Sequence, residues 1–218
     1  MNEVHGTNEP ATKPITRVLA LVVAASGGLG TGLFIAQRFQ GGEILPTAIW
    51  RVSAYLTDWS NVLAAGVCLA IAFGCTRLAT PFWRLLATSA IVVMAVLFAL
   101  IGGWANLGAQ DASSLLTHIV TPASMLLLWT FFLPHGGLYW RHIVGVAVFP
   151  IAYLAWTFAR GLMGGGYPYP EIDPAKVGWG GSAVFSASSL ILFLIIGSAL
   201  IVLDRGLARR RTRVRHPL

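Results

Sequence analysis

Six long apolar runs, separated by short polar segments, constrain the fold of this chain more than any other feature. A helix needs roughly 20 apolar residues to cross a hydrocarbon core of about 30 Å, and each run is long enough. The predicted membrane spans are residues 16–39, 47–75, 82–104, 113–133, 140–162 and 182–203.

The composition agrees with a membrane protein. Only 11% of the 218 residues are charged and 56% are hydrophobic, whereas soluble domains carry about 25% charged residues. Most of the surface therefore does not face water. We predict an all-α, polytopic transmembrane bundle of six spans over residues 15–204, preceded by a disordered leader (1–14) and followed by a basic cytoplasmic tail (205–218).

The distribution of Lys and Arg predicts the orientation. With the N-terminus inside, eleven Lys and Arg residues fall on the inner side and four on the outer side. Positive charge is enriched in cytoplasmic loops, so we expect both termini in the cytoplasm. The arginines after Asp204 fit a tail near anionic lipid headgroups, which makes membrane lipids the expected partners. No basic patch interleaved with aromatic residues points to nucleic acid.

The two cysteines, Cys68 and Cys75, fall in one apolar run. Seven residues of helix separate them by roughly 10.5 Å, which exceeds disulfide reach. We interpret both as small buried apolar residues.

Polar residues cluster at the start of the second predicted span. Ser53, Thr57 and Asn61 share one helix face, and Asp58 lies on an adjoining face. Thr57 should be roughly 15 Å deep, about ten residues from the outer end. Ionisable residues inside a membrane are costly and suggest a functional site. The alternative is a set of interhelical hydrogen bonds, with Asp58 paired to a cation.

Two further spans carry polar groups in the outer half of the predicted bundle. His118 lies about 9 Å into the fourth span, and its ordinary pKa near neutrality suits a general base. Arg160 ends the fifth span, on the face that also carries Tyr153. Each also has a simpler alternative role. His118 could only hydrogen-bond to a neighbouring helix, and Arg160 could only extend its charged group to the membrane interface. Together with Thr57, they suggest a site that opens towards the outer leaflet.

The sequence implies no metal and no cofactor. His118 has no second His or Cys at ligand spacing, and His135 and His142 are predicted on the other side of the membrane. Asp58 and His118 are residue types found in proton relays, so a small transporter remains an alternative function, although no inverted repeat is evident.

Three motifs carry a family resemblance. Residues 55–61 (Tyr-Leu-Thr-Asp-Trp-Ser-Asn) resemble a Tyr-Phe-Thr-x-x-Ser-Asn motif, and His118 followed by Pro122 resembles a second. Residues 153–161, followed by Tyr-Pro-Tyr-Pro at 167–170, resemble a third. Together they resemble the bacterial six-helix family called Pr-six-Pr. That family is distantly similar to the animal androgen-induced membrane hydrolases, including the androgen-dependent regulator of tissue factor pathway inhibitor.

The resemblance implies a bacterial inner-membrane protein and, through the animal enzymes, a threonine hydrolase of fatty acid esters of hydroxy fatty acids. Thr57 would be the nucleophile and His118 its partner. From the residues themselves, we expect Asn61 to supply an oxyanion donor and Asp58 to orient His118.

We also assign a substrate-binding role to Tyr153, Tyr167 and Arg160, with Arg160 rather than Arg51 holding a lipid carboxylate. The loop of residues 163–181 contains glycines and prolines and would form a lid over the site.

Two hypotheses therefore stand. One is an intramembrane hydrolase of lipid esters with Thr57 and His118 within hydrogen-bond reach. The other is a non-catalytic membrane protein, either a small transporter or an assembly component.

Overall fold

The protein is an α-helical membrane bundle. The computed structural model describes residues 13–101 and 111–215, with side chains as far as residue 210. In this part of the chain every regular element is a helix, and six helices are long and apolar enough to cross a membrane. The predicted fold class and number of spans are confirmed. The leader prediction (1–14) and the end of the third predicted span (102–104) fall almost wholly outside the described residues.

The spans follow one another along the chain. The first three are α1 (Pro14–Gln40), α3 (Leu56–Phe73) and α4 (Pro81–Leu100). The fourth is built from α5 (Ala112–Leu115), η2 (Leu116–Val120), α6 (Thr121–Leu127) and η3 (Leu128–Phe132). The last two are α7 (His142–Arg160), extended by η4 (Gly161–Gly165), and α8 (Pro174–Arg215). Two short helices lie between spans, α2 (Leu45–Val52) and η5 (Pro170–Ile172).

Local sequence explains where several helices begin and end. The Thr80 hydroxyl accepts a hydrogen bond from the Trp83 amide at the start of α4. The Asp111 carboxylate accepts one from the Ser114 amide, 2.8 Å away, at the start of α5. Both satisfy amides that have no partner inside the helix. Gly74, with φ 73°, ends α3 in the left-handed conformation that glycine adopts without strain.

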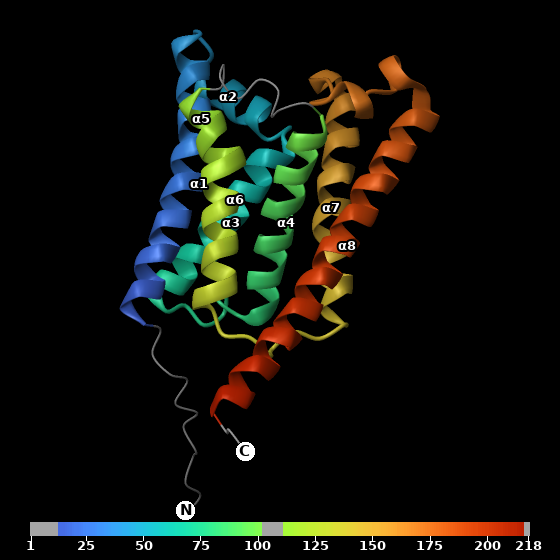
Figure 1. Cartoon of the computed structure of the whole chain (residues 1–218). Helices are drawn as coiled ribbons and strands as arrows, with labels where there is room; N and C mark the ends of the chain where they lie inside the picture. Colours follow the sequence, from blue (N-terminus) through green and yellow to red (C-terminus); the bar gives the residue numbers. More distant parts are fainter. Residues whose placement is uncertain (1–12, 102–110, 216–218) are drawn as a thin grey trace, which may run out of the picture.

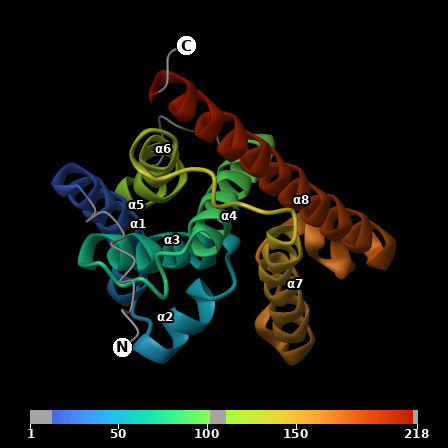
Figure 2. The same ribbon diagram turned by 90° about the horizontal axis from the view of Figure 1, so that it is seen from below.

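Helix α4 lies at the centre of the bundle, where it contacts α3, α6, α7 and α8. Helix α1 packs against α3 and against the α5–α6 region (Figures 1 and 2). Figure 1 also shows that α1 begins and α8 ends at the same end of the bundle. The opposite end carries α2 and the loop that leads to η5, and we call it the α2 end.

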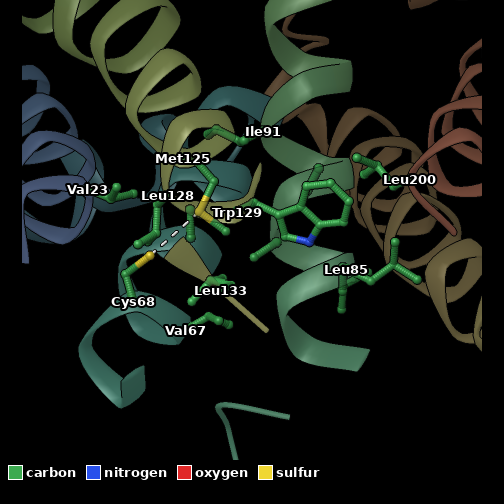
Figure 3. Close-up of a cluster of buried hydrophobic side chains, with 14 of the residues drawn as sticks. Val23, Val67, Cys68, Leu85, Ile91, Met125, Leu128, Trp129, Leu133 and Leu200 are labelled. Carbon is green, nitrogen blue, oxygen red and sulfur yellow. Dashed lines mark hydrogen bonds between the residues drawn. The ribbon is translucent and has the colours of Figure 1, made fainter. Parts of the chain in front are cut away.

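The interior is packed with apolar side chains from several helices (Figure 3). Cys68 of α3 and Met125 of α6 meet there, with their sulfur atoms 3.6 Å apart. Such close packing stabilises helix association in a membrane, where lipid is as apolar as the core. Cys68 is buried as predicted, but the prediction is wrong for Cys75, which is exposed because α3 ends at Phe73.

The second predicted span is not one helix. Residues 53–55 leave the helical path between α2 and α3, so the predicted span 47–75 is divided. Helix α2 lies across the end of the bundle, above the core (Figure 1). Of these two helices, only α3 is long enough to cross a membrane.

At the end of the bundle opposite the α2 end, a buried carboxylate joins α8 to the loop that precedes α7. Asp204 of α8 accepts hydrogen bonds from the amides of Gly136 (2.9 Å) and Leu138 (3.2 Å). Its other oxygen meets Nδ1 of His135 at 3.1 Å. The loop between η3 and α7 is therefore tied to α8. The predicted sixth span ended at residue 203, but α8 continues as a helix through the basic segment to Arg215.

We expect the α2 end to face the outside of the cell. Lys176, exposed at the start of α8, and Cys75, exposed at the opposite end, provide a matched pair of labelling positions. A membrane-impermeant maleimide should modify Lys176→Cys, made in a Cys75→Ser background, in intact cells. The native Cys75 should react only after permeabilisation. The reverse pattern would contradict the predicted orientation.

Candidate functional site

The break between α2 and α3 is held by aromatic hydrogen-bond donors. The indole N–H groups of Trp59 and Trp156 both donate to the carbonyl of Ser53, at 2.9 and 2.8 Å. The hydroxyl of Tyr153 donates to the carbonyl of Ala54 at 2.9 Å. Backbone groups that leave a helix in an apolar medium must find such partners. These three side chains therefore allow the chain to turn at this point.

The break decides the position of Thr57. It makes Thr57 the second residue of α3, in a turn whose amides have no acceptor within the helix. The prediction that Thr57 lies ten residues inside a continuous span is wrong, because that span is divided. The positive end of the α3 dipole now lies beside its hydroxyl.

Thr57 and His118 meet as the sequence predicted. The Thr57 Oγ1 atom and the His118 Nε2 atom are 3.2 Å apart. His118 lies in η2, a widened π-helical turn that ends just before Pro122. Proline has no amide hydrogen, and its ring clashes with the carbonyl four residues earlier in a regular helix, so the widened turn relieves that clash. Both side chains are half-buried.

The other ring nitrogen determines which hydrogen-bond roles His118 can play. Nδ1 lies 3.0 Å from the carbonyl oxygen of Ser114, which can only accept a hydrogen bond. The nearby Thr117 hydroxyl donates its own proton to the Ser113 carbonyl, 3.0 Å away. Nδ1 therefore carries the proton in the neutral ring, and Nε2 has a free lone pair for the Thr57 proton. The ring of Phe98 stacks on His118, with centroids 4.0 Å apart, and fixes its plane.

The pair faces an apolar pocket between α3, α4, α7 and α8, covered at the α2 end by the η5 loop. The polar side chains that line the pocket are Thr57, His118, Tyr153, Tyr169 and Ser189. The remaining lining residues are Leu56, Met94, Leu97, Phe98, Ile101, Pro150, Leu154, Ile172, Phe185 and Phe193. The loop predicted as a lid thus contributes side chains to the pocket.

Asn61 and Asp58 are close in sequence but face away from the pocket. Asn61 is fully buried, and its amide nitrogen donates to the carbonyls of Thr57 (2.8 Å) and Thr117 (3.3 Å). Both amide hydrogens are occupied, so the position does not favour the expected oxyanion role. Asp58 is buried against Thr31 of α1. The Ser114 carbonyl occupies the place at His118 Nδ1 that we had expected Asp58 to take.

The two arginines are engaged elsewhere. Arg160 is 5% exposed, donates to the Gly166 carbonyl at 2.7 Å and lies over the Trp50 ring. It does not line the pocket. This position favours a role in stabilising the loop over the expected binding of a lipid carboxylate. Arg51 pairs with Glu43 at 3.1 Å and does not line the pocket either.

The tyrosines near the site differ in position. Tyr153 lines the pocket, as expected for a substrate-binding residue. Tyr167 packs against Gly161 and Phe158, outside the pocket. Tyr169, which sequence reasoning had not selected, lines the pocket in its place. The Tyr-Pro-Tyr-Pro motif marked this loop, but two tyrosines in one motif gave no signal for choosing between them.

Among the described residues, no group of three or more His, Cys, Asp or Glu side chains lies together as a metal site would require.

Removing the Tyr153 hydroxyl should weaken the helix break. Tyr153→Phe leaves the buried Ala54 carbonyl without this donor, a loss of about 1–3 kcal/mol of stability. The thermal unfolding midpoint in detergent should fall below that of the wild type and of Tyr167→Phe, which removes a hydroxyl outside the pocket. Equal midpoints for the two variants would contradict this role.

No family model, no curated protein and no solved structure matches this chain.

Proposed function

We propose that this integral membrane protein is a hydrolase of lipid esters, in which Thr57 is the nucleophile and His118 the general base. The observation that carries the proposal is the 3.2 Å approach of Thr57 Oγ1 to His118 Nε2, with Nδ1 engaged by the Ser114 carbonyl. A threonine hydroxyl is a weak nucleophile until a base takes its proton, and a histidine in this tautomer is suited to do so.

The reaction proceeds in two acyl transfers. Thr57 Oγ1 attacks the ester carbonyl carbon while its proton passes to His118 Nε2. The tetrahedral intermediate collapses, the bond to the alcohol oxygen breaks, and His118 returns the proton to that oxygen. Water then attacks the acyl-threonine with His118 again as the base. The free acid leaves, and Thr57 recovers its proton.

The pocket supports an ester with an apolar chain. Its walls are aliphatic and aromatic, and among the described residues it is lined by no Lys, Arg, Asp or Glu side chain. An acyl chain would lie along these walls and place its ester carbon beside Thr57. This favours esters whose reacting end carries no charge, and it differs from the carboxylate-bearing substrates that the resemblance implies.

Covalent labelling with a fluorophosphonate probe should depend on Thr57. We expect purified wild-type protein to be labelled, Thr57→Ala to remain unlabelled and Thr57→Ser to retain labelling, because the hydroxyl is kept. His118→Gln should slow labelling by about 10²–10⁴-fold, the usual contribution of a general base. Mass spectrometry should place the adduct on the peptide that contains Thr57.

Ser189→Ala is the matched control. Ser189 also presents a hydroxyl to the pocket, but that hydroxyl donates to the Phe185 carbonyl at 2.9 Å and has no histidine partner among its described contacts. This variant should be labelled like the wild type. Labelling of Thr57→Ala at the wild-type rate, or an adduct on Ser189, would contradict the assignment of the nucleophile.

A further inference from the structure

A carbonyl attacked by Thr57 needs a hydrogen-bond donor for the negative charge that develops on its oxygen. Asn61 cannot serve, because both of its amide hydrogens are held by backbone carbonyls. The donor must therefore come from another side chain of the pocket or from the first turn of α3. The hydroxyls that line the pocket differ in the acceptor to which each donates its proton.

Three of these hydroxyls have already given their protons to other acceptors. Tyr153 donates to the Ala54 carbonyl at 2.9 Å, and Ser189 donates to the Phe185 carbonyl at 2.9 Å. Thr57 gives its proton to His118 Nε2. Among the pocket hydroxyls of the described residues, this leaves Tyr169 as the one whose proton is not held by a backbone carbonyl or by the histidine.

The surroundings of Tyr169 aim its hydroxyl at the nucleophile. The hydroxyl is buried against the Thr57 side chain, the Tyr153 hydroxyl and the Leu56 amide. Tyr169 has a single hydroxyl proton, which goes to the Tyr153 oxygen, because Tyr153 has given its own proton to the Ala54 carbonyl. The Tyr169 ring is held edge-on by Tyr55, with centroids 6.0 Å apart. Burial raises the pKa of Tyr169 well above its usual range, so it remains a neutral donor.

We propose that Tyr169 is a catalytic residue that donates a hydrogen bond to the oxyanion of the tetrahedral intermediate. This inference rests on the proposed hydrolysis at Thr57. As the Thr57 oxygen bonds to the carbonyl carbon, the negative charge moves to the carbonyl oxygen. Tyr169 then turns its O–H from the Tyr153 oxygen to that atom, without giving up its proton.

Tyr169→Phe should lower kcat for a medium-chain p-nitrophenyl ester by about 10²–10³-fold, the usual cost of one oxyanion donor, with KM little changed. Inhibition by a long-chain trifluoromethyl ketone, which forms a tetrahedral adduct with the nucleophile, should weaken in parallel with kcat. Tyr167→Phe, in the same loop but outside the pocket, should behave like the wild type in both assays.

The outcomes separate the two proposals. An active wild type in which Tyr169→Phe keeps the kcat and ketone affinity of Tyr167→Phe would overturn the role of Tyr169 alone. A Tyr169→Phe variant that loses kcat with a lower unfolding midpoint, but binds the ketone as tightly as wild type, would make Tyr169 structural and overturn it too. A wild type that neither hydrolyses the ester nor binds the ketone would overturn the proposed function itself.

Discussion

The site depends on one requirement, that backbone carbonyls released from a helix inside an apolar bundle must find donors. At residues 53–55 these donors are Trp59, Trp156 and Tyr153. An unsatisfied peptide group in such a medium costs several kcal/mol, so the three side chains make the break possible. The break in turn places Thr57 at the start of α3, beside a dipole of the right sign for a developing negative charge.

The histidine is oriented without a carboxylate. A backbone carbonyl fixes the proton on Nδ1, and the stacked Phe98 ring fixes the plane of the imidazole. A carboxylate at this depth would carry a desolvation cost that a carbonyl does not. The arrangement therefore provides the tautomer that the proposed general base needs, and the described lining of the pocket holds no Lys, Arg, Asp or Glu side chain.

The length of the apolar runs predicted the six spans. The alternating direction of the helices placed Thr57 and His118 in the same half of the membrane, and the family resemblance paired them. The sequence did not predict the helix break. Residues 53–55 contain neither proline nor glycine, and two of the three donors lie about 100 positions away on α7. The role of Asn61 was misjudged for a related reason, since one acceptor of its amide is the Thr117 carbonyl on another span. The choice of Tyr169 over Tyr167 required the path of the loop, which a repeated Tyr-Pro pair does not specify.

The proposed function requires that His118 holds its proton on Nδ1 and offers the Nε2 lone pair to Thr57. Nitrogen-15 NMR of protein labelled at histidine, reconstituted in lipid at a pH above 8, measures this directly, with His118→Gln identifying the resonances. We predict a protonated Nδ1 and an unprotonated Nε2, whose resonance shifts in Thr57→Val as the hydrogen bond is lost. A proton on Nε2, or an Nε2 resonance that is the same in Thr57→Val, would contradict this arrangement of Thr57 and His118.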